Sequence, residues 1–495
     1  MNNIMPTITT DFYFAASPIF ILCIGAVVAM LFSAHSKLSN TKMGELIVYL
    51  TLAAAGTLLP FVSKGETTLF LDGAYLSDQV FGFSRLVVIY VAILVALMVS
   101  ASSLRKQFFR PEMASIYLIV VCGLLVLVSS MDLISIFVGL EMSSIGLYAL
   151  VGYIVATPKS QEGAMKYFVL GSVSVAFLLF GFALAYAATG SLNISEIFSA
   201  AKNLSGTAQQ LMSLGVIFIV VGLGFKFALA PFHIWAPDAY ESAPTAITAF
   251  MATAAKAAIL LLLLRIVMES RFLMNELWRP SLTILALASI LLGNIMALAQ
   301  ASLKRMLAYS SIAHSGYMAI GMAALGGSDD LFTNKAILFY ILFYTVISIG
   351  AFAIMQFLES EKTQNIQLQD LAGLAKKQPW AAFGLAVFMF SFAGLPPSVG
   401  FMSKLFIFKA ALSQGMIFLV LVGVLGSAIS LYYYLRVIVF MYMKPAQEVS
   451  IITTHRSPVL FVLAGVMVIL TLVFGTIAPS LGLDRMKEYA IAVGP

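Results

Sequence analysis

Long apolar runs recur along almost the whole chain, and they constrain its fold more than any other feature. Each run holds about 20 mainly apolar residues, the length that an α-helix needs to cross a bilayer. Apolar residues make up 61% of the sequence and charged residues only 10%, whereas a soluble domain has about 45–50% apolar residues. The pattern therefore predicts an all-α polytopic membrane protein.

We expect about fourteen transmembrane helices, with boundaries placed to within a few residues. The first apolar run lacks a basic segment before it and is long enough to span, which argues against a cleavable signal peptide. The predicted spans are residues 12–33, 45–63, 81–102, 112–130, 133–156, 163–188, 209–229, 244–268, 280–302, 305–325, 332–357, 379–411, 414–442 and 458–479.

The charges of the short loops predict how the chain is oriented. Loops after odd-numbered spans are rich in basic residues, among them Arg105, Lys106, Arg110, Lys376 and Lys377. Loops after even-numbered spans mix bases with acids. The positive-inside rule then places the odd loops in the cytoplasm and both termini outside. The loop after the seventh span departs from the pattern, because it carries Asp238 and Glu241 and no base.

The composition also excludes several classes of function. The net charge is +6, but the basic residues are scattered over short loops and form no patch for nucleic acid. Cys23 and Cys122 are the only cysteines, and both lie inside apolar runs. An iron–sulfur cluster usually needs four thiolates. We therefore expect no iron–sulfur cluster in this chain, and we expect no metal site.

Proline interrupts two of the predicted spans. Pro231 lies near the end of the seventh, and Pro396 with Pro397 lies within the twelfth. Proline removes a backbone donor, so each break needs protein or water to satisfy the freed carbonyls. Breaks five spans apart are the spacing that two inverted five-helix repeats produce, and such repeats place ion sites near the midplane. We expect one membrane domain, residues 1–495, with three N-terminal helices (1–111), a first repeat (112–268), a second repeat (280–442) and a C-terminal helix and tail (443–495).

Five ionisable residues lie well inside the predicted spans. A charge at the bilayer centre costs a few kcal/mol at least, so such positions are candidates for function. At 1.5 Å per residue, Glu141 lies about 12 Å and Lys256 about 18 Å from the start of its span. The five residues are Glu141, Lys226, Lys256, His314 and Lys404.

Two interpretations of these charges compete. Each could form a structural ion pair or extend to the membrane surface, and this suits the residues near span ends, which are Lys335, Lys409, Arg265 and Arg436. However, one acid cannot neutralise three midplane lysines, and burial favours the neutral form of lysine. A lysine that exchanges between its two forms can accept and release a proton, with histidine and water bridging the gaps. The midplane residues therefore predict a proton relay.

Two further charged positions and one aromatic run have alternative interpretations. Lys166, at the start of the sixth span, is either a cytoplasmic anchor or a modulator of the relay. His233, beside the first break, either bonds to a freed carbonyl or transfers a proton. The run Tyr432, Tyr433 and Tyr434 is more typical of interfacial anchoring or packing than of a functional site.

At these residues the chain resembles the antiporter-like membrane subunits of respiratory complex I (NADH:quinone oxidoreductase), and among them the subunit N branch. The resemblance covers essentially the whole chain and is most specific over residues 222–238, 304–314 and 394–404. It implies an ion pair between Glu141 and Lys226. It also implies that Lys256 is the central lysine and Lys404 the terminal lysine on the broken twelfth span. Lysine rather than glutamate at position 404 favours the subunit N branch over subunit M.

The resemblance further implies a division of labour among subunits. NADH, flavin, iron–sulfur clusters and quinone would be bound by partner subunits, and this chain would couple their electron transfer to proton pumping. The expected partners are subunits K and M and membrane lipid, without nucleic acid, in a bacterial inner membrane with periplasmic termini. Two alternatives remain: a subunit of an Mrp-type cation/proton antiporter, and a membrane scaffold whose charges are inert pairs.

Overall fold

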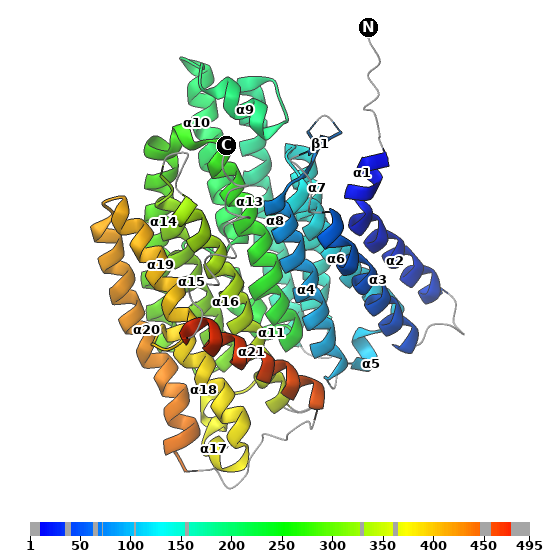
Figure 1. Cartoon of the computed structure of the whole chain (residues 1–495), viewed down its shortest axis with the longest axis vertical. Coiled ribbons are helices and arrows are strands. Elements are labelled where there is room, and N and C mark those ends of the chain that lie inside the picture. The colour runs from blue at the N-terminus through cyan, green and yellow to red at the C-terminus, as the bar shows by residue number, and fades with distance from the viewer. Residues whose placement is uncertain are drawn as a thin grey trace.

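The computed structural model describes residues 10–34, 41–62, 68–71, 73–102, 105–153, 158–326, 331–359, 365–445 and 457–476. Most of these residues belong to helices that run side by side along the long axis of one bundle, with α21 lying obliquely across its surface (Figure 1). Twelve of the described helices are long and apolar enough to cross a membrane. The prediction of an all-α polytopic membrane fold is confirmed.

The N-terminal part contributes three membrane-crossing segments and a short hairpin. In the hairpin, β1 (Thr68–Phe70) pairs antiparallel with β2 (Tyr75–Ser77). The helices of this part are α1 (Thr10–Ala15), α2 (Ser17–Ala34), α3 (Thr41–Val62), α4 (Gln79–Ser100) and α5 (Arg105–Phe108).

The next part contains the first proline break, between α10 and α11, and a composite helix in which a π-helical turn, η1, separates α12 from α13. The elements are α6 (Pro111–Ser129), α7 (Leu133–Val151), α8 (Pro158–Thr189), α9 (Ile194–Ala201), α10 (Thr207–Lys226), α11 (Trp235–Ser242), α12 (Thr245–Phe250), η1 (Met251–Ala255) and α13 (Lys256–Glu269).

The remaining chain contains the second proline break, between α18 and α19, and ends its described part with α21. The elements are η2 (Arg271–Leu273), η3 (Met274–Trp278), α14 (Arg279–Leu298), α15 (Leu303–Ala323), α16 (Leu331–Leu358), η4 (Leu368–Leu371), α17 (Leu374–Lys377), α18 (Pro379–Ala393), α19 (Val399–Ser413), α20 (Ile417–Met443) and α21 (Pro458–Thr476). The tail after Thr476 lies outside the described residues.

Several predicted boundaries differ from the structure for local reasons. The seventh span ends at Lys226 rather than at residue 229, because the chain leaves helical geometry before Pro231. The twelfth, predicted as one run over 379–411, is two helices of 15 residues each, α18 and α19. The sixth span begins at Pro158, not at residue 163, which places Lys166 in the third turn of α8.

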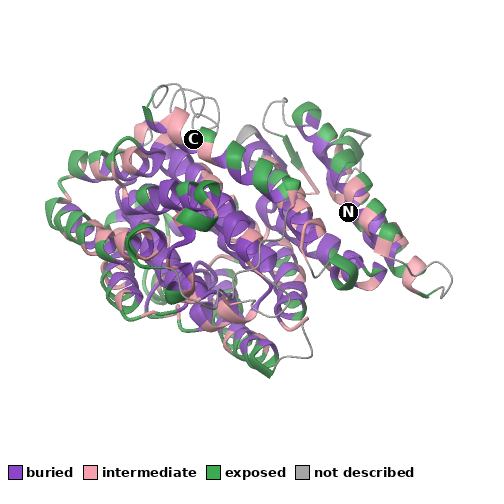
Figure 2. Ribbon diagram, turned by 90° about the horizontal axis from the view of Figure 1, so that it is seen from below, coloured by how far each residue is buried: buried purple, intermediate pink, exposed green. Residues whose placement is uncertain are grey.

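One membrane-crossing helix differs from the twelve apolar ones in composition. Almost every residue of α15 is buried, although it carries several serines, two tyrosines and a histidine. The composite helix Thr245–Glu269 is also enclosed, with 94% of its most apolar window buried. Buried residues fill the middle of the bundle and exposed residues its outside (Figure 2). The polar helix α15 therefore lies inside the protein, shielded from lipid.

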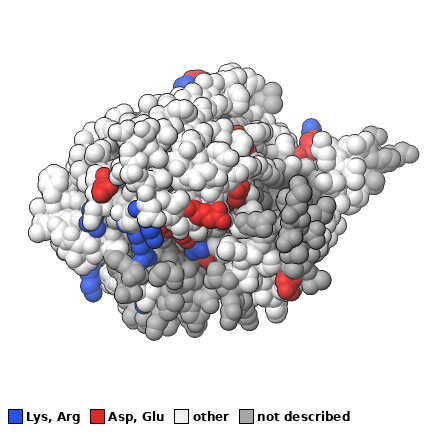
Figure 3. Space-filling view, turned by 90° about the horizontal axis from the view of Figure 1, so that it is seen from above, with Lys and Arg blue, Asp and Glu red and all other residues white. Residues whose placement is uncertain are grey.

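The loops alternate between the two ends of the bundle, as an up-and-down path requires. Elements α5 and α17, which follow odd-numbered spans, lie at the lower end in Figure 1, whereas β1 and α9 lie at the upper end. Viewed from the upper end, charged side chains are sparse and acids lie beside bases (Figure 3). These four elements are thus divided between the two ends of the bundle.

Candidate functional site

Both predicted proline breaks are present, and each is covered by side chains of neighbouring helices. At the first break, the indole Nε1 of Trp235 donates a hydrogen bond to the carbonyl of Phe225, at 2.9 Å. The Ser315 hydroxyl of α15 donates to the carbonyl of Phe227, also at 2.9 Å. Carbonyls freed by a break need such partners away from water. The hydrogen bond from Ser315 thus connects the first break to α15.

At the second break, the C-terminal end of α18 is capped by a lysine. The Nζ atom of Lys404 donates to the carbonyls of Phe392 and Ala393, both at 3.0 Å. Gly394 adopts φ +79°, and a Cβ atom there would lie 2.9 Å from the Lys404 side chain. Glycine is required here both by this left-handed conformation and by the close approach of the lysine.

Lys404 has a third partner and is buried. Its Nζ atom lies 2.9 Å from the Ser427 hydroxyl of α20 and 4.9 Å from the centre of the Tyr317 ring. The three N–H groups of an ammonium are therefore all matched to acceptors. No carboxylate lies within ion-pair distance of Lys404 among the described residues.

Lys226, the last residue of α10, reaches across to α7. Its Nζ atom donates to the Ser144 hydroxyl at 2.8 Å and to the Tyr148 hydroxyl at 3.1 Å. Glu141 lies on the same face of α7, because positions 141, 144 and 148 follow the i, i+3, i+7 spacing of a helix.

Glu141 and Lys226 are both described by the structure, but they form no direct ion pair. The prediction of such a pair is therefore wrong for this structure. The lysine binds the two hydroxyls farther along α7 instead of the carboxylate. The two residues still interact electrostatically. One carboxylate oxygen of Glu141 is buried and has no hydrogen-bond partner in the described part of the chain.

Lys256 lies directly after the π-helical turn η1 and is also buried. Its Nζ atom donates to the carbonyl of Ser311 at 2.9 Å, to the hydroxyl of Ser311 at 2.5 Å and to the hydroxyl of Ser315 at 2.8 Å. Single π-helical turns occur often at functional sites. Ser315 also bonds to the carbonyl of Phe227, so it joins the Lys256 site to the residue after Lys226.

His314, on α15 between Ser311 and Ser315, extends this chain of polar groups toward α16 and α20. Its Nδ1 atom lies 2.8 Å from the Tyr340 hydroxyl, and its Nε2 atom lies 3.4 Å from the Tyr434 hydroxyl. Beside it is a small cavity of about 10 Å³, lined in part by Ser403, the neighbour of Lys404 in sequence. This is about the space that one water molecule needs.

The structure divides the tyrosine run between the two expected roles, packing and an outward position. Tyr433 and Tyr434 are buried, and the hydroxyl of Tyr433 donates to Asn294 at 2.9 Å. Tyr434 is hydrogen-bonded to Ser310 and faces His314. Only Tyr432 lies outside, with 64% of its surface exposed. Two of the three rings thus belong to the polar interior and not to the membrane surface.

Lys166 belongs to an ionic cluster where α8, α11 and α15 meet. It pairs with Asp238 at 2.9 Å, and Arg305 pairs with the same aspartate at 2.5 Å. Arg305 also pairs with Glu241, at 3.2 Å. The acidic segment that departed from the charge pattern is therefore neutralised by bases from other helices. The structure does not bring Lys166 together with the three buried lysines.

His233 also lies apart from the lysine sites. Its ring is edge-on to Tyr309, with the ring centres 6.5 Å apart. Two of the partners of the freed carbonyls are Trp235 and Ser315, as described above. His233 also has a hydrogen bond to the backbone of Pro231, at the break, which agrees with the first of the two roles weighed for it.

A buried pair at the start of the composite helix escaped the sequence analysis. Lys304 lies 3.1 Å from Glu359, which follows α16 directly. The same carboxylate accepts a hydrogen bond from Thr245, the first residue of the helix that leads to Lys256, at 2.5 Å. Only three-dimensional packing reveals this contact, because Glu359 reads as a loop residue in the sequence.

Charges near the span ends serve structural contacts. Arg265 pairs with Asp78 at 2.9 Å, and Arg436 donates to backbone carbonyls between α14 and α15. Lys409 lies 4.8 Å from the centre of the Phe332 ring. For these residues, the structural interpretation accounts for the contacts.

The geometry defines a membrane protein with three buried lysines around a polar central helix and two broken helices. The sequence pattern of the family described as NADH:quinone oxidoreductase/Mrp antiporter, transmembrane, matches residues 130–430. The chain therefore belongs to this family.

Within the family, the chain is similar to NADH-quinone oxidoreductase subunit N of several bacteria. The Nitrosomonas europaea protein is 35% identical over 98% of this chain and 100% of its own length. The Trichlorobacter lovleyi protein is 41% identical over 78% of each chain. Among solved structures, a chain of respiratory complex I from Thermus thermophilus is 32% identical, with a TM-score of 0.80 over 97% of this chain and 100% of that one.

An Mrp complex from Dietzia has the same fold. Its matching chain gives a TM-score of 0.82 at 21% identity, over 97% of this chain and 96% of that one. At this level of identity the comparison concerns the fold alone.

Proposed function

We propose that this chain is the proton-translocating membrane subunit of an NADH–quinone oxidoreductase. One observation carries the proposal: Lys226, Lys256 and Lys404 are all buried, and each has a hydroxyl among its hydrogen-bond partners. A hydroxyl can accept from an ammonium and can donate to a neutral amine. Each lysine can therefore lose its proton without leaving a buried polar group unpaired.

A structural ion pair would need a different arrangement. A buried ammonium that serves only stability is usually held by a carboxylate, because an unpaired buried charge is costly. Here the partners are hydroxyls and carbonyls, and the nearest acid to Lys226, Glu141, interacts without direct contact. Such a lysine is held in place in both of its protonation states.

The order of contacts suggests the course of a proton. Lys226 is joined to Lys256 through the backbone of Phe227 and the hydroxyl of Ser315. Beyond the serine partners of Lys256, α15 presents His314, which lines a small cavity together with Ser403 and Gly400 of α19, the helix that carries Lys404. Glu141 biases the charge on Lys226, since a carboxylate favours the protonated form of a nearby amine.

The other parts of the proposal come from the relatives. Their name implies an assembly in which NADH is oxidised and quinone is reduced, so this chain is proposed as a non-redox subunit of a translocase. NADH, flavin, iron–sulfur clusters and quinone are then bound by partner subunits, and subunits K and M are the proposed neighbours. The proposed location is a bacterial inner membrane, with the α5 and α17 end in the cytoplasm and both termini in the periplasm.

The Mrp-type antiporter is the alternative function in the same family. The subunit N relatives are 35–41% identical, whereas the Mrp chain is 21% identical, so the first function is favoured. Purification of the native membrane complex followed by mass spectrometry separates the two. Peripheral flavin and iron–sulfur proteins are expected for the oxidoreductase, and an assembly of membrane subunits alone would contradict it.

The relay itself is tested by substitution of its central lysine. Lys256→Ala is expected to assemble but to lose most proton pumping and the quinone reduction coupled to it. Lys409→Ala is the matched control, because Lys409 contacts an aromatic ring near a helix end. Both activities are measured in membranes that contain equal amounts of assembled complex. Full coupled activity in Lys256→Ala would leave the scaffold interpretation in place.

A further inference from the structure

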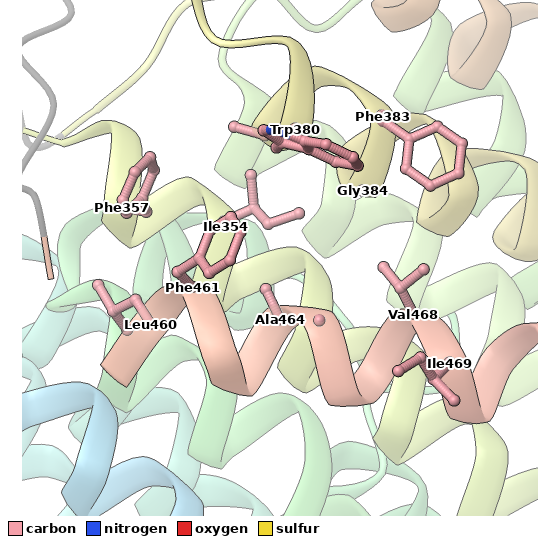
Figure 4. Close-up of a pocket in the computed structure, with 12 residues that line it drawn as sticks. Ile354, Phe357, Trp380, Phe383, Gly384, Leu460, Phe461, Ala464, Val468 and Ile469 are labelled. Carbon is pink, nitrogen blue, oxygen red and sulfur yellow. The ribbon is translucent and has the colours of Figure 1, made fainter. Parts of the chain in front are cut away.

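An apolar groove opens on the outer surface of the bundle, and none of the buried lysines lines it. Its walls come from the end of α16, the start of α18 and the first half of α21 (Figure 4). The groove has a volume of about 270 Å³. Its walls include Ile354, Phe357, Trp380, Phe383, Phe461 and Val468.

Small residues form the floor of the groove and keep it open. Gly384, Ala464 and Gly465 all line it, and a Cβ atom added at Gly465 would meet no other atom within 4 Å. On α21 the lining extends from Leu460 to Ile469, which is about 14 Å along the helix at 1.5 Å per residue.

The volume and the apolar lining of the groove indicate which kind of molecule can bind there. A segment of α-helix about 14 Å long and 10 Å in diameter occupies roughly 1,100 Å³, several times the volume of the groove. The lining is apolar apart from the Trp380 indole nitrogen, so a quinone ring would find almost no partner for its oxygens. A single hydrocarbon chain meets both conditions.

The mouth of the groove has the features of a membrane surface that attracts anions. Trp380 lies there with 72% of its surface exposed, and tryptophan favours the boundary between lipid and water. Lys376 and Lys377 precede it at the end of α17, and both are exposed. Within the described part of the chain, neither lysine forms an ion pair.

We propose that this groove binds one acyl chain of an anionic phospholipid, whose phosphate is held by Lys376 and Lys377. The apolar walls supply affinity for any acyl chain, and the two lysines select the negative headgroup. A basic residue near an anionic membrane surface contributes about fivefold in affinity. The groove contains none of the buried lysines of the proposed proton relay. A test of lipid binding therefore does not depend on whether the proposed function is correct.

The test uses the assembled complex in phosphatidylcholine vesicles, with phosphatidylglycerol or phosphatidylcholine carrying a photoactivatable acyl chain. After illumination, mass spectrometry of peptides should find adducts on α18 and α21, more abundant for phosphatidylglycerol. The double variant Lys376→Gln, Lys377→Gln should lose roughly tenfold or more of the phosphatidylglycerol adducts and keep those of phosphatidylcholine. Lys202→Gln is the control, because Lys202 is an exposed lysine at the opposite end of the bundle.

A second variant fills the groove. Gly465→Leu should remove the adducts of both lipids and keep α21 folded, because leucine is the better helix former. Val466→Leu is its control, since Val466 lies on the same helix outside the groove lining. If the two lipids label the groove equally and the lysine substitutions leave that labelling unchanged, the proposed headgroup site is wrong. Absence of groove adducts in the assembled complex would show that a neighbouring subunit covers it and would overturn the proposal.

Discussion

Replacing Ser311 by alanine weakens the set of hydrogen bonds that holds Lys256, and it also removes the acceptor of the Tyr344 hydroxyl, which lies 2.9 Å from the Ser311 hydroxyl. The substitution removes a hydroxyl 2.5 Å from Nζ and leaves the backbone carbonyl of the same residue and the Ser315 hydroxyl in place. A hydrogen bond to a charged group stabilises by about 1.5–3 kcal/mol. The hydroxyl also bonds to the neutral amine, by about 0.5–1.5 kcal/mol. Its loss therefore shifts the balance of Lys256 toward the neutral amine only by the difference, about 1–1.5 kcal/mol or roughly five- to tenfold.

We expect Ser311→Ala to assemble normally and to lower the coupled rate of proton pumping and quinone reduction by about five- to tenfold. Ser143→Ala is the matched control, because Ser143 is also a buried helix serine but donates only to Leu140 of its own helix. Pumping is followed with a pH-sensitive dye and quinone reduction by NADH absorbance, in membranes with matched complex content.

A double variant gives the decisive comparison. If Ser311 acts through Lys256, then Lys256→Ala with Ser311→Ala should be no slower than Lys256→Ala alone, because residues that share one interaction are not additive. Independent, multiplicative losses would refute the reasoning, and so would a Ser311→Ala rate equal to that of Ser143→Ala.

Three other predictions test separate features of the structure. Glu141→Gln should assemble and lose much of the coupled activity, whereas Glu141→Asp should be milder; equal, full activity in both would remove Glu141 from the relay. Cys23 and Cys122, whose sulfur atoms lie 3.3 Å apart, should both be replaceable by alanine with activity nearly intact, and loss of an iron–sulfur signal in the double variant would contradict this. Gly394→Ala should lower stability by about 1 kcal/mol or more, because φ there is positive and the cost of that conformation is of this order; an unchanged thermal midpoint of the purified complex would oppose it.

The orientation is tested with single cysteines and a membrane-impermeant thiol reagent. Labelling is expected only from the cytoplasm, because these loops belong to the basic set, and labelling from the periplasm would reverse the topology. The positions, which lie outside the described residues, are Ser103, Thr363 and Ala446.

The sequence located the charges and the breaks but not their partners. Lys226, Lys256 and Lys404 stand out because ionisable residues are rare in apolar runs, and the prolines mark the breaks through backbone chemistry alone. Which group each lysine binds depends on how distant helices pack. The ion pair expected between Glu141 and Lys226 failed for this reason, because hydroxyls of the same helix face lie closer to the lysine.

Hydroxyl spacing was a signal that the sequence did contain. Ser144 and Tyr148 follow Glu141 at helical intervals, and Ser311 and Ser315 flank His314 at one turn. A polar stripe on an otherwise apolar helix indicates an inward face. The tyrosine run is divided between packing and an exposed position because three adjacent residues on a helix point in different directions, so their burial differs from one to the next.

The π-helical turn before Lys256 has a consequence for how this helix tolerates changes in length. A turn closed by i→i+5 bonds contains one residue more than an α-turn, so the segment Met251–Ala255 holds a surplus residue relative to a regular helix. Deleting one residue there would restore α-helical spacing and keep both flanking halves on their present faces. A deletion elsewhere in the helix would rotate everything beyond it by about 100° and turn Lys256 or its neighbours away from α15. The composite helix Thr245–Glu269 is thus equivalent to a regular α-helix with one extra residue next to Lys256.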